Sequence, residues 1–174
     1  MENTGSNNRP SKNRRSTLFL TDAALIAALY VLLTWLTNLL GLANGQIQVR
    51  LSEALCILPV FTLSAVPGLF VGCLLANIIT GAALPDIIIG SLTTLLAAYL
   101  THKLRNNKYP AIIPPIALNT LVIPLLLYYV YGIIPLWLSF ITVFAGEFIS
   151  AGIIGLLLYN VLSKHRAELF SHRS

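Results

Sequence analysis

Long apolar runs, separated by short polar stretches, make up most of the chain after residue 17. Four of them are clear: residues 18–42, 86–101, 111–130 and 135–162. A fifth, Leu51–Ile79, is longer and ambiguous. An α-helix rises about 1.5 Å per residue, so roughly 20 apolar residues cross a bilayer core of about 30 Å. The pattern predicts an all-α bundle of membrane-spanning helices.

The run Leu51–Ile79 fits either one long tilted helix or two short ones broken near Pro59 and the sequence SAVPG at 64–68. Basic residues resolve this ambiguity, because cytoplasmic loops carry an excess of Lys and Arg. With six helices and the basic N-terminus inside, the basic loop at 102–109 and the C-terminus both fall inside. Five helices would put that loop outside. The sequence therefore predicts six spans with both termini cytoplasmic.

Domain boundaries follow from the same pattern. Residues 1–17 are rich in Asn, Ser, Arg and Lys and are predicted to be a disordered basic cytoplasmic tail. Residues 18–163 form the predicted six-helix membrane domain, and residues 164–174 form a second cytoplasmic tail.

Composition supports the membrane class. Of the 174 residues, 56% are hydrophobic and 10% charged, and the mean hydropathy is +0.80, whereas about 25% of the residues in a typical soluble domain are charged. The net charge of +5 does not indicate a nucleic-acid partner, because the basic residues other than Arg50 flank the apolar runs instead of gathering on one surface. The expected surroundings are a lipid bilayer.

Four acids lie within the membrane region, namely Asp22, Glu53, Asp86 and Glu147, and Arg50 is the only base there. A charge at the bilayer centre costs about 2.5–3.5 kcal/mol on insertion scales, so the presence of each acid requires a structural or functional explanation. Glu147 requires such an explanation most, because it lies about 18 Å along the last span and so is deep in the membrane. Ala145-Gly146 beside it leaves room for a ligand or a neighbouring helix.

The other charged residues have structural alternatives. Three residues along a helix place Arg50 and Glu53 on one face, so they could form a local ion pair instead of binding a ligand. Asp86 could cap its helix, bind a ligand, or do both. Asp22 is expected in the first turn of the first helix, where an acid favours the helix dipole.

Neutral polar and aromatic residues complete the candidate set. Gln48, Asn77 and Asn119 can donate or accept hydrogen bonds, and Asn119 could bond across helices without any ligand. Aromatic residues gather near the outer end of the last two helices, where an interfacial belt is the usual explanation. They are Tyr128, Tyr129, Tyr131 and Trp137.

The first helix contains two overlapping Ala-x-x-x-Ala spacings, formed by Ala23, Ala24, Ala27 and Ala28. Small residues four apart allow close helix contact. The spacing alone leaves open whether that contact lies within the bundle or with a partner.

Other motifs are missing from the sequence. It has no Walker motif, no nucleophile beside a base, and no Cys-x-x-Cys or His-x-x-x-His spacing. Cys56 and Cys73 lie in apolar runs and are expected to be buried thiols. We therefore expect neither an enzyme nor a cofactor or metal.

The block GQIQVRLSEALCILPVF, followed by AVPGLFVGCLLANIITGA and DIIIGSLTTLLAAYLT, resembles the QueT family, the substrate-binding S components of energy-coupling factor transporters. The resemblance implies a six-helix bundle in a bacterial plasma membrane, with a substrate pocket near the outer face. It implies a transmembrane coupling (T) subunit and two ATPase subunits as partners. The alanine strip would dock the coupling subunit. The implied substrate is a queuosine precursor, such as an aminomethyl-deazaguanine base.

A deazaguanine fits the candidate residues. Glu53, Asp86 and Glu147 can accept its N–H groups or pair with its cationic arm. Arg50, Asn77 or Asn119 can donate to its carbonyl. Which carboxylate has which role stays open. We expect a bulky residue at Ala27 to block uptake without affecting ligand binding.

Three alternatives to this function remain. The chain could be an S component for another vitamin-like substrate. It could also be a stand-alone secondary transporter driven by protons through Glu147. An intramembrane enzyme or assembly factor is disfavoured by the lack of a catalytic arrangement.

Overall fold

Helices build the described part of the chain. The computed structural model describes residues 12–42 and 49–165, and every regular element within these ranges is helical. η1 is a 3₁₀ helix and η2 a π-helix, and α6, η2 and α7 follow one another without a break. The elements are α1 (Lys12–Leu39), η1 (Leu51–Val60), α2 (Ala65–Ile79), α3 (Leu84–Lys103), α4 (Lys108–Ala111), α5 (Ile113–Tyr131), α6 (Leu136–Glu147), η2 (Phe148–Ile154) and α7 (Gly155–Lys164).

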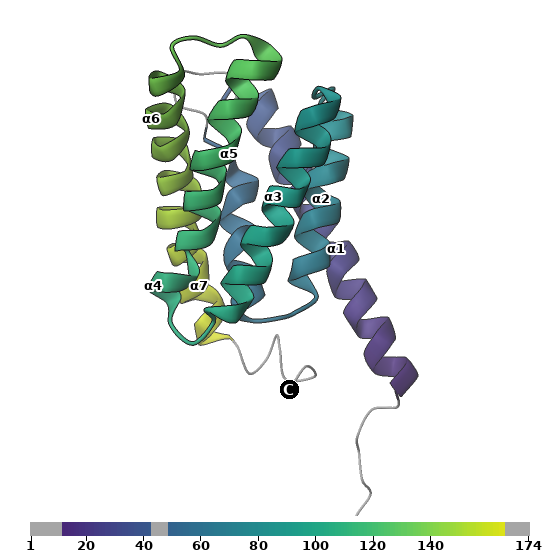
Figure 1. Cartoon of the computed structure of the whole chain (residues 1–174). Helices are drawn as coiled ribbons and strands as arrows, with labels where there is room; N and C mark the ends of the chain where they lie inside the picture. The colour runs from purple at the N-terminus through teal and green to yellow at the C-terminus, as the bar shows by residue number, and fades with distance from the viewer. Residues whose placement is uncertain (1–11, 43–48, 166–174) are drawn as a thin grey trace, which may run out of the picture.

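The long helices lie side by side as an upright bundle (Figure 1). The turns at 80–83 and 132–135 lie at one end, called here the upper end. The connections at 61–64 and 104–107 and the end of α7 lie at the opposite, lower end. The first turns of α1 project beyond the bundle at the lower end, so both ends of the described chain are on that side.

Helix length and hydropathy fit a membrane. Within the described ranges, four helical segments are long and apolar enough to cross a bilayer, while η1 and α2 are shorter apolar helices. Large apolar side chains such as Leu25, Leu92, Leu121 and Phe144 are exposed on the outside of the bundle. A lipid environment accounts for such a surface, whereas a soluble protein rarely exposes large contiguous apolar areas. The four segments are Asn13–Leu39, Leu84–Lys103, Lys108–Tyr131 and Leu136–Lys164.

The first helix starts earlier than predicted, at Lys12 instead of Leu18. Thr17 and Thr21 donate from their hydroxyls to the carbonyls of Asn13 and Thr17, at 3.0 and 2.9 Å, and so bond within the helix. Lys and Arg are good helix formers as well. Asp22 therefore lies in the interior of α1 and not in its first turn. Residues 1–11 and 166–174, which belong to the predicted tails, lie outside the described residues.

The ambiguous run Leu51–Ile79 forms two helices, η1 and α2, joined at residues 61–64. Pro59 lies near the end of η1, where its missing N–H disfavours continuation of the helix. Pro67 and Gly68, which we expected at the break, lie in the first turn of α2. A proline is tolerated there because the first N–H groups of a helix have no partner within it.

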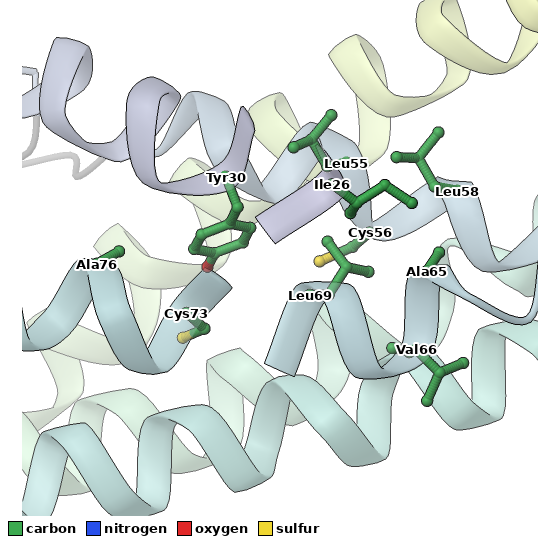
Figure 2. Packing of buried hydrophobic residues seen from close by; sticks show 11 residues of the cluster. Ile26, Tyr30, Leu55, Cys56, Leu58, Ala65, Val66, Leu69, Cys73 and Ala76 are labelled. Atoms are coloured by element: carbon green, nitrogen blue, oxygen red, sulfur yellow. The ribbon is translucent and has the colours of Figure 1, made fainter. Parts of the chain in front are cut away.

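The core joins α1, η1 and α2, and glycines set its closest contact. A Cβ added at Gly72 would lie 2.7 Å from Tyr30 Cβ and 3.0 Å from Ala27 Cα, and one at Gly68 would lie 2.8 Å from the Ala23 carbonyl oxygen. Only glycine therefore lets α2 approach α1 this closely. Figure 2 shows the core cluster and labels Ile26, Tyr30, Leu55, Cys56, Leu58, Ala65, Val66, Leu69, Cys73 and Ala76; Ala98 of α3 also belongs to it.

Candidate functional site

The residues that line a cavity of about 610 Å³ come from helix ends and a turn at the upper end of the bundle. Its walls come from the end of α1, the α2–α3 turn, the start of α3 and the end of α5. The volume lies within the roughly 300–1,000 Å³ that small-molecule sites occupy. Its polar lining includes Thr34, Thr37, Asn38, Arg50, Asn77 and Asp86, and its aromatic lining is Trp35 and Tyr131.

Asp86 faces this cavity from the first turn of α3 and does not cap the helix, because the N-cap position is Ala83. The Tyr131 hydroxyl donates to Asp86 Oδ2 at 3.2 Å and accepts from the Ala83 N–H at 3.0 Å. Asn77 Nδ2 donates to the Asp86 carbonyl at 3.4 Å. An acid in the first turn of a helix is favoured by the helix dipole. Asp86 is therefore held in place and still open to the cavity.

Arg50 and Glu53 form no salt bridge with each other in the described structure. Arg50 precedes η1 with an extended backbone (φ −105°, ψ 106°), is half-buried, and lines the cavity. Glu53 lies inside η1 and is 2% exposed. Positions three apart align in a 3₁₀ helix, but Arg50 lies outside the helical geometry. The local ion pair that we allowed for is absent from the described structure.

Glu53 accepts three hydrogen bonds instead. Tyr30 Oη donates to Oε1 at 2.5 Å, and Oε2 accepts from Asn119 Nδ2 at 3.3 Å and from Cys56 Sγ at 3.1 Å. A buried carboxylate needs such donors to replace its lost hydration. Cys56 and Cys73 are buried free thiols, as predicted.

Glu147 is less well satisfied. Asn119 Nδ2 donates to its Oε1 at 3.0 Å, but Oε2 is buried and has no hydrogen-bond partner among the described residues. The residue is 7% exposed. A buried acceptor without a partner costs about 1–3 kcal/mol, more when charged. A void of about 10 Å³ lies beside it, lined by Arg50, Ile123, Val143 and Glu147.

Asn119 joins the two acids, since its amide donates to both Glu53 and Glu147. The interhelical bond that we allowed for at Asn119 is present in the structure, and it ties α5 to η1 and α6. We call Tyr30, Glu53, Cys56, Asn119 and Glu147 the carboxylate cluster. An acceptor free of partners inside this cluster is suited to binding an N–H group.

The predicted site residues thus form two groups. Arg50, Asn77 and Asp86 line the cavity, while Glu53, Asn119 and Glu147 belong to the carboxylate cluster. Gln48 lies outside the described residues.

Sequence reasoning missed Tyr30 and Trp35. Both lie in an apolar helix, where neither residue type suggests a site. The available signal for Tyr30 was its position three residues after Ala27, on the face of α1 that packs on α2. Of the four aromatic residues singled out near the outer end, Tyr131 lines the cavity and Tyr128, Tyr129 and Trp137 do not.

The two alanine strips face different ways. Ala23 and Ala27 pack against Gly68 and Gly72 of α2, so they contribute to packing within the bundle. Ala24 and Ala28 lie about 100° further around α1 and are exposed. A bulky residue at Ala27 is therefore expected to disturb the fold, contrary to our expectation from the sequence, because it would push against α2.

Comparison with known proteins gives a consistent picture. The family model described as "QueT transporter" matches residues 20–164. The queuosine precursor transporter QueT of Lactococcus lactis subsp. cremoris (strain MG1363) is 32% identical over 83 residues, which is 48% of this chain and 48% of that protein. The aligned stretch thus spans about half the length of this curated relative. No solved structure matches the chain.

Proposed function

The chain belongs to the QueT transporter family, and we propose that it is the substrate-binding S component of an energy-coupling factor uptake transporter in a bacterial plasma membrane. Its apolar helices and its family make it a multi-pass membrane protein. In this proposal the chain binds the substrate, and separate ATPase subunits supply the energy through a coupling subunit. The chain itself is then not an enzyme.

The charge distribution supports six spans with cytoplasmic termini. Arg14 and Arg15 belong to the start of α1, Lys103 ends α3 and Lys108 begins α4. These helix ends are at the lower end, together with both ends of the described chain. Because positive residues favour the cytoplasmic side, the lower end faces the cytoplasm in this proposal. The cavity at the upper end then opens to the outside, where an uptake protein meets its substrate.

The observation that carries the proposal is a ligand-sized cavity with an acid on its wall and a buried carboxylate cluster beside it. We propose a queuosine precursor such as 7-aminomethyl-7-deazaguanine as the substrate, in keeping with the name of the relative. Its ammonium arm fits Asp86, its planar ring fits Trp35 and Tyr131, and Arg50 or Asn77 can donate to its carbonyl.

The role of Asp86 is testable in the purified protein. Asp86→Asn should weaken binding of 7-aminomethyl-7-deazaguanine about two- to fivefold, since a partly exposed ion pair contributes only about 0.5–1 kcal/mol. Titration calorimetry measures this effect. The matched ligand is 7-deazaguanine, which lacks the ammonium arm and should bind both proteins equally. An equal loss of affinity for both ligands in Asp86→Asn would show that Asp86 does not pair with the ammonium arm.

Docking to the coupling subunit is proposed for the exposed strip formed by Ala24 and Ala28 on α1. Ala28→Leu should lower uptake by cells about fivefold or more, because it fills a surface on which two helices approach closely. Binding by the isolated protein should remain unchanged. The control is Leu25→Phe, which enlarges another exposed side chain on α1 outside the strip. Equal uptake by both variants would show that Ala24 and Ala28 are not part of the interface.

Reconstitution separates this proposal from a stand-alone secondary transporter. In proteoliposomes, the chain alone should give no uptake of 7-aminomethyl-7-deazaguanine under a pH gradient. Uptake should begin when the coupling subunit, both ATPases and ATP are included. Transport by the chain alone, abolished by Glu147→Gln, would favour the proton-driven alternative.

A further inference from the structure

The void beside Glu147 is too small to hold a ligand while Arg50 keeps its place. It measures about 10 Å³, and even a single water needs roughly 10–15 Å³. The outer cavity, by contrast, has the volume of a small-molecule site. Among the described residues that line either space, Arg50 alone lines both. The Arg50 side chain is therefore the wall that they share.

One unmet acceptor lies on the inner side of this wall. Glu147 lines the void, and its Oε2 is buried without a hydrogen-bond partner among the described residues. Both Glu53 oxygens, in contrast, already accept hydrogen bonds. Of the two acids in the carboxylate cluster, Glu147 is thus the one with capacity for a ligand. Glu53 accepts a hydrogen bond from Asn119 and so helps to hold the amide that also donates to Glu147.

We propose that Arg50 is a movable partition, and that a ligand displaces it so that an exocyclic amino group of a planar heteroaromatic ring reaches Glu147 Oε2. This inference rests on the proposed function. Arg50 has a long side chain and forms no salt bridge with another described residue, so moving it breaks no close ion pair. Its guanidinium is attracted to Glu53 and Asp86 over a longer distance. The ammonium arm of the ligand remains at Asp86 in the outer cavity. The two carboxylates thereby take different parts of one ligand.

The inner subsite is tested by removing one amino group from the ligand. Titration calorimetry compares 7-aminomethyl-7-deazaguanine with 7-aminomethyl-7-deazahypoxanthine, which has hydrogen in place of the 2-amino group. The wild-type protein should prefer the first compound at least tenfold, and Glu147→Gln should reduce that preference to about twofold or less. Asp86→Asn is the matched control and should keep the preference, because both compounds carry the arm.

Two outcomes would overturn the subsite: equal binding of both compounds by the wild-type protein, or a preference that survives in Glu147→Gln. In both cases the protein still binds a deazapurine and the proposed function stands. Binding of neither compound by the wild-type protein would instead remove the proposed function and the subsite together.

The partition is tested by kinetics. The chain has two tryptophans, and Trp35 lines the outer cavity while Trp137 does not. In a Trp137→Phe protein, rapid mixing with 7-aminomethyl-7-deazaguanine should change Trp35 fluorescence in two phases. The fast phase should depend on ligand concentration, and the slow phase should not. Adding Arg50→Ala should remove the slow phase. A single phase at all concentrations in the Trp137→Phe protein, or a slow phase that survives Arg50→Ala, would overturn the partition.

Discussion

Glu147→Gln is expected to weaken binding of 7-aminomethyl-7-deazaguanine by more than tenfold. The carboxylate oxygen Oε2 is buried without a partner, so it can accept a ligand N–H with no hydrogen bond lost within the protein. Hydrogen bonds to charged groups contribute about 1.5–3 kcal/mol, which corresponds to a factor of roughly 10 to 150. Titration calorimetry on the detergent-solubilised protein measures the change.

The control for this prediction is Cys56→Ala, which removes one of the three donors to Glu53 and leaves Glu147 intact. It should alter the affinity far less than Glu147→Gln. Unchanged affinity in Glu147→Gln, in a protein that melts at the wild-type temperature, would place Glu147 outside the binding site.

Gly72→Ala is expected to lower the free energy of unfolding by about 1–3 kcal/mol, the usual cost of overpacking. The new methyl group would lie 2.7 Å from Tyr30 Cβ and 3.0 Å from Ala27 Cα, and the latter cannot move without moving α1. The substitution would also disturb Tyr30, which donates to Glu53. Equilibrium unfolding in detergent micelles, followed by circular dichroism, gives the value.

Gly155→Ala is the matched control, because it adds the same methyl group at a helical glycine with more room. Its nearest neighbour would be the Ala54 carbonyl oxygen at 3.6 Å, an ordinary contact. Alanine is favoured over glycine in a helix by about 0.5–1 kcal/mol, so this variant should be neutral or slightly more stable. A similar loss of stability in both variants would show that the α1–α2 contact is no more closely packed than the surroundings of Gly155.

Helix positions were predictable because the physical signal is strong. Apolar runs of about 20 residues identify the long helices, and the basic loop at 102–109 favoured two helices over one in Leu51–Ile79, as the structure has it. Acids in apolar surroundings pointed to Glu53 and Glu147 because burying a charge is costly. These arguments depend only on composition along the chain.

The arrangement of side chains within the site was less predictable. Arg50 and Glu53 do not share a helix face, because Arg50 lies just before a 3₁₀ helix with an extended backbone, and helix type is not readable from an apolar run. Tyr30 looked like any apolar residue, since its partner is 23 positions away. The overlapping alanine strips share one spacing, and only the glycines of α2 distinguish the packed strip from the exposed one.

The π-helix η2 has a consequence for the last helix as a whole. Successive residues of an α-helix are rotated by about 100°, and a π turn closes its hydrogen bond over one residue more than an α turn. Because η2 lies between α6 and α7, the residues that follow it are rotated around the helix axis relative to where a continuous α-helix would place them. With this rotation, Glu147 faces Asn119 while Gly155, further along the same continuous helix, faces η1. If Phe148–Ile154 were α-helical at its present length, Gly155 would be rotated by about 100° relative to Glu147 and only one of the two contacts could form. Deleting one residue from this segment should instead let it close as an α-helix and keep both contacts.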